Sequence, residues 1–372
     1  MIGNEIIYQI FTRNYSPEGT FESVRKDLQR IKDLGVDIVY LTPIHPISEK
    51  ERKGTCGSPY AIKDYFAIEP SYGTIDDFKH LIRDVHSLGM KIIIDMVFNH
   101  TGRDNVLLTT HPEYYFYKNG KLGNRVGDWS DIVDLDTSRD DTQEYLLSVL
   151  KYWRNVGVDG YRFDVASMIP FIFFKKAREA LGKEVIFIGE SIDYDFATYL
   201  RSIGDNPTPD KKMYEVFDAL YNYSWFRTFD KYLNHKVPID DLVKALNDDS
   251  KLLKDVGVRL NCLENHDTER IALKEDKDKL DNVTGFLFHL KGMVFIYMGQ
   301  ECELTHRPNL FERDPVELFI KNASYGIYKE LIKEKKKQPL NIYQTFEKAD
   351  ESTIKVVTYK NDEYLEERVF RI

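Results

Sequence analysis

Four short segments rich in charged residues follow apolar runs at separate places along the 372-residue chain. They are residues 95–100 (DMVFNH), 160–164 (GYRFD), 187–190 (FIGE) and 264–267 (ENHD). Each apolar run has the composition of a buried β-strand, and acids, histidines or an arginine gather where the run ends. Functional side chains of a parallel β-barrel lie at the carboxyl ends of its strands. The four segments therefore predict an α/β fold, a (β/α)8 TIM barrel with its site at one rim.

Strand-like and helix-like patterns alternate over most of the sequence. Apolar residues recur at helical spacing in residues 21–34, 142–153 and 240–253. Thr74 and Asp77 resemble a capping box at the start of another helix. Eight candidate strands separate the helical segments, which is the number that a closed barrel needs. They are residues 6–11, 37–43, 91–97, 158–164, 185–190, 214–221, 258–264 and 293–299.

Two segments interrupt this alternation. Residues 101–135 are irregular, polar and aromatic, and they follow the third candidate strand, where a barrel carries its site loops. The tail contains strand-like patterns at 353–359 and 367–372, which are too few for a β-sandwich of about seven strands. We therefore expect a barrel formed by residues 1–100 and 136–338, a short inserted domain at 101–135, and a short or truncated C-terminal β domain at 339–372.

The composition and charge exclude several partners. A net charge of −9 and a pI of about 5.6 argue against a nucleic-acid partner. No apolar stretch approaches the roughly 18 residues that suggest a membrane-spanning helix. The N-terminus enters a strand-like run without the features of a signal peptide, which predicts a cytoplasmic protein. The sequence carries no indication of oligomeric state.

Three acids end the fourth, fifth and seventh candidate strands: Asp164, Glu190 and Asp267. Because these strand ends meet at one rim, the three carboxylates are expected to lie close together. Cleavage of a glycosidic bond commonly uses two carboxylates, one as a general acid and one as a base or nucleophile. Neighbouring like charges separate the two pKa values, and Arg162 would keep Asp164 ionised.

Each of these residues also has a structural interpretation. A single Asp at a strand end is more often a turn or helix cap than a catalyst, and an Arg two residues away often forms a structural ion pair. A buried His such as His100 or His266 is more often a satisfied core residue. Tyr60 or Trp129 alone more often packs in a core than contacts a sugar. The functional interpretation rests on their joint occurrence, in a consistent order, at successive strand ends.

This joint pattern resembles the four conserved regions of the α-amylase family of glycoside hydrolases. The matching motifs are Asp95-x-x-x-Asn-His100, Gly160-x-Arg-x-Asp164, Gly189-Glu190 and Asn265-His-Asp267. Additional segments similar to family patterns include Ser58-Pro-Tyr60 and residues 131–136 and 296–301. The resemblance covers nearly the whole chain and implies a TIM barrel, a short domain B and an α-glucan substrate.

The resemblance implies a role for each candidate site residue. Asp164 matches the nucleophile that forms a covalent glycosyl-enzyme, and Glu190 matches the general acid that later becomes the base. Asp267 matches the third carboxylate, which binds sugar hydroxyls and favours ring distortion. Four further residues match groups that contact the sugar: Tyr60 as an aromatic platform, and His100, Arg162 and His266 beside the scissile bond.

The resemblance also bears on calcium. Asn99 matches a ligand in calcium-dependent members, and Asp134 could contribute a further oxygen. Members with a tight calcium site often carry Lys and His three and four residues after the nucleophile, where this sequence has Ser167 and Met168. The sequence therefore predicts that no cofactor is required, with Asn99 and Asp134 as the candidate ligands of any calcium ion.

One further difference concerns specificity. Exo-acting α-glucosidases of the family often carry an Asp three residues before the platform Tyr, whereas this sequence has Gly57. The difference favours an open cleft and an α-amylase-type hydrolase of α-1,4 bonds in starch or maltodextrins. Two alternatives stay open: a glucanotransferase or other α-glucosidase of the same family, and an inactive carbohydrate-binding relative.

Overall fold

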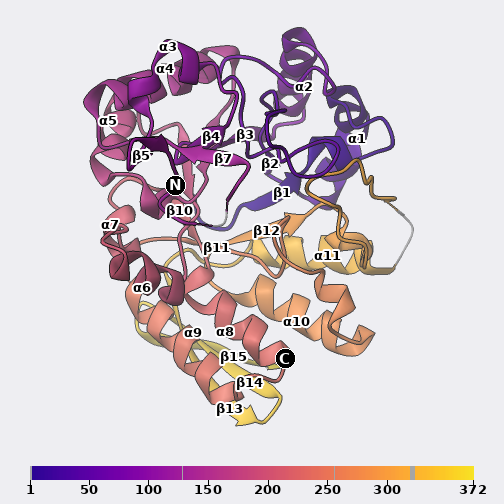
Figure 1. Cartoon of the computed structure of the whole chain (residues 1–372). Coiled ribbons are helices and arrows are strands. Elements are labelled where there is room, and N and C mark those ends of the chain that lie inside the picture. The colour runs from indigo at the N-terminus through magenta and orange to yellow at the C-terminus, as the bar shows by residue number, and fades with distance from the viewer. Residues whose placement is uncertain (1, 128, 255, 319–322) are drawn as a thin grey trace.

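The structure is a computed structural model that describes residues 2–127, 129–254, 256–318 and 323–372. Eight parallel strands close into a barrel in the order β1-β12-β11-β10-β9-β8-β3-β2 (Figure 1). The predicted (β/α)8 TIM barrel is therefore confirmed. The barrel strands are β1 (Ile6–Ile10), β2 (Ile38–Leu41), β3 (Lys91–Met96), β8 (Gly160–Phe163), β9 (Ile186–Gly189), β10 (Ala219–Tyr221), β11 (Arg259–Asn261) and β12 (Met293–Tyr297).

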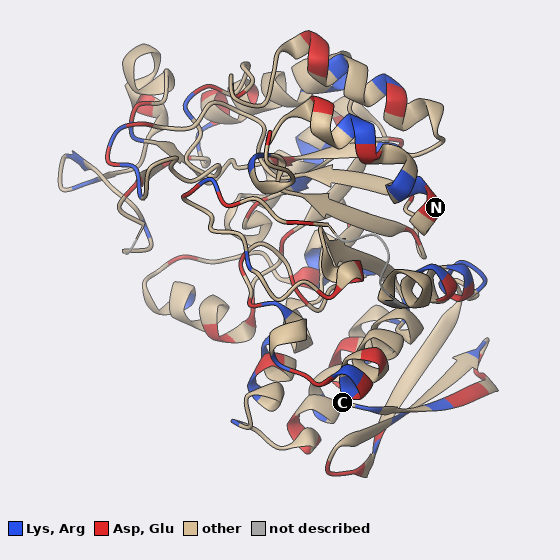
Figure 2. Cartoon of the chain, turned by 90° about the vertical axis from the view of Figure 1, so that its right-hand side faces the viewer, with Lys and Arg blue, Asp and Glu red and all other residues tan. Residues whose placement is uncertain are grey.

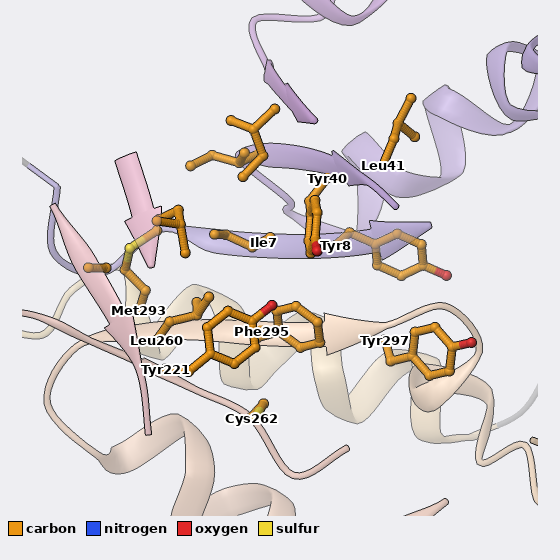
Figure 3. Packing of buried hydrophobic residues seen from close by; sticks show 14 of the residues in the cluster. Ile7, Tyr8, Tyr40, Leu41, Tyr221, Leu260, Cys262, Met293, Phe295 and Tyr297 are labelled. Atoms are coloured by element: carbon orange, nitrogen blue, oxygen red, sulfur yellow. The ribbon is translucent and has the colours of Figure 1, made fainter. Parts of the chain in front are cut away.

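The barrel interior is filled by large side chains that support the rim. The ring of Phe295 lies 5.8 Å from the ring of Tyr221 and 6.2 Å from that of Tyr40 (Figure 3). The guanidinium of Arg162 lies 5.5 Å from the ring of Tyr221. The aromatic core thus packs directly against an arginine of the predicted site, which limits the movement of that side chain.

Amphipathic helices cover the outside of the barrel. Thr74 and Asp77 exchange side-chain and backbone hydrogen bonds at the start of α2, which confirms the capping box. The α-helices outside the segment between β3 and α4 are α1 (Phe21–Leu34), α2 (Ile75–Ser87), α4 (Asp140–Val156), α5 (Phe171–Leu181), α6 (Tyr194–Ser202), α7 (Asp210–Met213), α8 (Tyr223–Leu233), α9 (Ile239–Leu253), α10 (Lys277–His289) and α11 (Ala323–Lys335).

The sixth strand is shorter than the sequence predicts. Residues 214–218 were expected to open this strand, but they form turns after α7, and β10 begins at Ala219. The N–H groups of Val216 and Phe217 donate to the carbonyl of Met213. These apolar residues are buried, so the run has the composition of a strand although its backbone hydrogen bonds are local.

Short elements between β3 and α4 form an excursion above the barrel. They are β4 (His100–Gly102), α3 (Leu107–Thr110), β5 (Tyr117–Lys118), β6 (Lys121–Leu122) and β7 (Ile132–Asp134). Strands β4 and β7 pair antiparallel, with His100 opposite Asp134. The pairing returns the chain to the rim close to where it left, so the base of this segment borders the site.

The C-terminal segment is a three-stranded antiparallel sheet of β13 (Ile342–Asp350), β14 (Thr353–Lys360) and β15 (Glu363–Arg371). The sequence patterns predict β14 and part of β15 but miss β13. The sheet packs beside α9 and α10 (Figure 1), where the ring of Phe370 lies 5.7 Å from that of Phe286. It lies away from the strand ends that form the rim.

Charged residues lie mainly on the outer helices and loops, and the barrel strands carry few of them (Figure 2). Within the described residues, we find no helix with the length and apolar character needed to cross a membrane.

Candidate active site

The strand ends surround a cleft of about 410 Å³, a size typical of small-molecule sites. Arg162 lies beneath its floor and contacts two of the acids in it. The structure therefore brings all seven predicted catalytic and sugar-binding residues together. The other six line the cleft: Tyr60, His100, Asp164, Glu190, His266 and Asp267.

Arg162 is buried and binds three carboxylates. Its Nη1 donates to Asp95 Oδ1 at 2.9 Å and to Asp164 Oδ1 at 2.8 Å. Its Nη2 lies 2.9 Å from Glu190 Oε2 as an ion pair, without the geometry of a hydrogen bond. One guanidinium thus holds Asp164 and Glu190 near each other, although they come from different strands.

A strained turn follows Asp164. Val165 has φ 35° and ψ 45°, a left-handed conformation that a β-branched residue rarely adopts. In this conformation the Val165 N–H donates to Glu190 Oε2 at 2.8 Å. Backbone strain of this kind persists where the surrounding structure enforces it, often at functional sites. The turn therefore orients the Glu190 carboxylate relative to Asp164.

The electrostatics of Asp164 differ from the simple expectation. Burial raises the pKa of Asp164 well above its usual range; Arg162 opposes this shift and the nearby Glu190 adds to it. The predicted effect of Arg162 is therefore present but smaller than the effect of burial. The nearby Glu190 carboxylate thus disfavours ionisation of Asp164, while Arg162 favours it.

Asp95 lies under the cleft and connects several site residues. Its Oδ2 accepts hydrogen bonds from the hydroxyls of Tyr40 at 2.5 Å and Tyr60 at 2.9 Å, in addition to the contacts with Arg162. Burial raises its pKa, while Arg162 lowers it. Asp95 does not line the cleft, so it orients the guanidinium and the Tyr60 ring from below.

His266 and Tyr60 form a stacked pair, with ring centroids 5.0 Å apart and planes at 8°. Burial lowers the pKa of His266 to about 4, so the imidazole is neutral near pH 7. The side-chain nitrogen of Gln9 lies 3.0 Å from His266 Nδ1. An amide nitrogen can only donate a hydrogen bond, so His266 Nδ1 is the acceptor. The His266 proton is thereby assigned to Nε2, which lies 3.2 Å from Asp267 Oδ2.

His100 and Asp267 complete the lining. The His100 ring lies 5.8 Å from the ring of Trp129, and burial lowers its pKa to about 4. The Asp267 side chain is 50% exposed, so its carboxylate can reach the hydroxyl groups of a bound ligand. Both residues therefore present hydrogen-bonding groups to the cleft.

Tyr223 and Gln9 contact predicted site residues but were not identified from the sequence. Tyr223, from the start of α8, has its hydroxyl 3.5 Å from Glu190 Oε1 and accepts a hydrogen bond from Asn265 at 2.9 Å. Gln9, near the end of β1, contacts His266. The strand-end argument could have identified Gln9, because it precedes the end of the first strand by one residue. No sequence pattern indicated Tyr223.

Asn99 and Asp134 lie outside the cleft lining, at the base of the excursion. Asn99 Oδ1 and Asp134 Oδ1 are buried without hydrogen-bond partners, and burial raises the pKa of Asp134 to about 6. These are oxygen atoms of the kind that calcium prefers, but calcium takes 6–8 such ligands. The described residues contain no cluster of three or more His, Cys, Asp or Glu side chains suited to a metal. The fit to a calcium ion is thus incomplete.

Arg125 already supplies a positive charge at this position. Its backbone N–H donates to Asp134 Oδ2 at 2.7 Å, its Nη1 lies 3.9 Å from the same oxygen, and its Nη2 donates to the Leu135 carbonyl. We therefore expect chelation of calcium with EGTA to change the melting temperature and the activity very little. Differential scanning fluorimetry and a starch assay, each with EGTA and with added Ca²⁺, would check this. A large loss of either with EGTA would contradict it.

The sequence-family model of the α-amylase catalytic domain matches residues 6–126 and 125–356 of this chain. The intracellular maltogenic amylase of Bacillus subtilis (strain 168) is 28% identical over 329 residues, which cover 80% of this chain and 50% of that protein. The chain therefore spans about half the length of this curated relative.

Two solved structures are similar over almost the whole chain. An α-amylase from Lactobacillus plantarum has a TM-score of 0.90 and 39% identity, with coverage of 96% of this chain and 85% of that chain. A noncanonic maltogenic α-amylase from Thermotoga neapolitana has a TM-score of 0.87 and 32% identity, with coverage of 99% and 85%. The chain belongs to the α-amylase family of glycoside hydrolases.

Proposed function

We propose that this protein is a retaining hydrolase that cleaves α-1,4-glucosidic bonds in starch or maltodextrins. The observation that supports this most is that Asp164 and Glu190 face one cleft and contact the same guanidinium. Retaining glycosidases need two carboxylates about 5–5.5 Å apart, with one of them protonated. The shared arginine brings two carboxylates from different strands together, as such a pair requires.

In the first step, Glu190 donates its proton to the glycosidic oxygen while an Asp164 oxygen bonds to the anomeric carbon. The bond between that carbon and the glycosidic oxygen breaks, and the leaving sugar departs with a new hydroxyl group. The hydrogen bond from Arg162 to Asp164 Oδ1 orients the attacking carboxylate. The Val165 N–H and the Tyr223 hydroxyl orient Glu190.

In the second step, Glu190 takes a proton from a water molecule, whose oxygen bonds to the anomeric carbon and displaces Asp164. Asp267, His100 and neutral His266 hold the hydroxyl groups of the reacting sugar, and the ring of Tyr60 lies against its apolar face. Because both histidines are neutral near pH 7, they can donate hydrogen bonds without placing a positive charge beside the developing cation.

The names of the relatives support a maltodextrin substrate. One is called an intracellular maltogenic amylase and another a maltogenic α-amylase. We propose that this protein likewise acts on maltodextrins, and inside the cell. Transfer of the glycosyl group to a sugar hydroxyl instead of water is the alternative reaction of the same intermediate.

Product analysis on maltoheptaose, pullulan and sucrose would test the proposal. We expect reducing sugar and shorter maltooligosaccharides from maltoheptaose, with much less product from sucrose. Chromatography at early times separates hydrolysis from transfer. Early products longer than maltoheptaose, with little reducing sugar, would identify a transferase, and absence of any product would contradict the proposed function.

A further inference from the structure

The cleft has two different sides relative to Glu190, and this inference rests on the proposed function. Glu190 lies beside Tyr223 of α8, and the cleft continues there to Phe196 and Arg227. Because Glu190 protonates the leaving oxygen, the leaving part of the substrate lies on this side. The opposite side, toward Tyr60 and His100, then receives the part that becomes bonded to Asp164.

Three side chains line the cleft across the barrel from Glu190, because β2 and β12 flank β1, which lies opposite β9 in the barrel order. Lys53 Nζ forms a 2.9 Å ion pair with Asp131 Oδ1, and it lies 5.9 Å from the centre of the Phe311 ring. All three residues line the cleft. They come from the loops that follow β2, β3 and β12, so the contact joins three distant parts of the chain. We call these three residues the Lys53 bridge.

Hydrogen bonds join the loop that carries Lys53 to the loop that carries Phe311. The Cys56 N–H donates to the Phe311 carbonyl at 2.9 Å, and the Thr55 N–H donates to Glu312 Oε1 at 2.9 Å. The buried Arg13 donates through Nη2 to the Gly57 carbonyl at 3.0 Å and also to the Leu310 carbonyl. The loops after β2 and β12 are therefore joined independently of the contact between Lys53 and Asp131.

The backbone conformation at position 57 explains why a glycine occurs there. Its φ is +72°, and a Cβ atom there would lie 2.9 Å from Ile47 Cγ2 and 3.3 Å from the Ser48 carbonyl oxygen. A side chain at this position would be strained, which gives the glycine a structural reason independent of the substrate. The open cleft stays a prediction that Gly57 alone does not test.

We propose that the Lys53 bridge closes the end of the cleft that receives the glycosyl part of the substrate. In an α-1,4-glucan, this part runs from the cleaved bond to the non-reducing end. A closed end accepts only a short non-reducing terminal segment, so the enzyme acts at chain ends and releases a short product. Lys53 and Asp131 are then specificity-determining residues, and they take no part in bond cleavage.

The test compares two chromogenic maltoheptaosides, one with a free non-reducing end and one with that end blocked by an acetal on its last sugar. We expect the native enzyme to cleave the blocked substrate at least about tenfold more slowly, as steric exclusion from a pocket typically gives. Lys53→Met and Asp131→Asn should raise kcat/KM on the blocked substrate about tenfold and give a broader range of products from maltoheptaose. Lys53 is partly exposed and Asp131 is buried, so circular dichroism should verify that both variants are folded.

Lys63→Met is the matched control, because Lys63 has a similarly exposed side chain and pairs with Glu49 and Asp104 without lining the cleft. It should behave as the native enzyme on both substrates. Equal cleavage of blocked and free substrates by the native enzyme would overturn the inference while leaving the proposed hydrolysis intact. An unchanged preference in folded Lys53→Met and Asp131→Asn would also overturn it. Cleavage of neither substrate by the native enzyme would refute the proposed function and this inference together.

Discussion

Asp164→Asn and Glu190→Gln are each expected to lower kcat on maltoheptaose by about 10⁴-fold or more, as removal of a principal catalytic group does in other hydrolases. Asparagine at 164 is too weak a nucleophile to form the glycosyl-enzyme. Glutamine at 190 cannot donate or accept the proton. Initial rates of reducing-sugar release would measure both losses, with circular dichroism to verify that each variant is folded.

The two variants should differ on an activated substrate. A maltosyl fluoride has a leaving group that needs little protonation, so Glu190→Gln should recover part of the first step and Asp164→Asn should not. Asp193→Asn is a suitable control, because Asp193 lines the same cleft but caps α6, a role that asparagine can also fill. Near-native activity of either catalytic variant would contradict the assigned roles.

Arg162→Met is expected to destabilise the protein by roughly 3–5 kcal/mol, the usual cost of removing one partner from a buried ion pair. Asp95, Asp164 and Glu190, whose side chains are at most 11% exposed, would lose their common positive partner. Methionine preserves most of the side-chain volume, so the loss is chiefly electrostatic. Urea denaturation of both proteins at pH 7 would measure the difference.

The pH dependence of the stability loss distinguishes an electrostatic cause from a packing defect. Burial already raises the pKa values of Asp95 and Asp164, and removal of Arg162 raises them further. A raised folded-state pKa means that stability is present at low pH and is lost as pH rises through that pKa. The penalty of Arg162→Met should therefore be larger at pH 8 than at pH 5. Equal penalties at both values would indicate a packing effect.

Arg178→Met provides the comparison for the same substitution elsewhere. Arg178 pairs with a single carboxylate, Asp218 at 2.9 Å, and donates to the Val185 and Val216 carbonyls away from the cleft. Arg178→Met should lower the free energy of unfolding by less than Arg162→Met does, and this loss should depend less on pH. A penalty equal to that of Arg162→Met would contradict the special role of the three carboxylates.

The elements predicted correctly from the sequence are those that a local pattern of residues specifies. The eight barrel strands and the capping box at Thr74 follow from apolar runs and capping residues, and the structure contains them. The sixth strand was predicted too long, because residues 214–218, which include the apolar Val216 and Phe217, form turns. Strand β13 was missed, because its second half, which includes Glu347, Lys348 and Asp350, lacks the alternating pattern of apolar residues.

The chain sequence by itself determined the barrel and the acids at its rim. Strand ends carry their side chains to one place in any closed parallel barrel, so Asp164, Glu190 and Asp267 could be grouped without coordinates. Only the tertiary structure decided how they interact. The left-handed turn at Val165, the contact of Tyr223 with Glu190 and the Lys53 bridge each join segments distant in sequence. Such contacts depend on loop geometry and burial, which no local pattern of residues encodes.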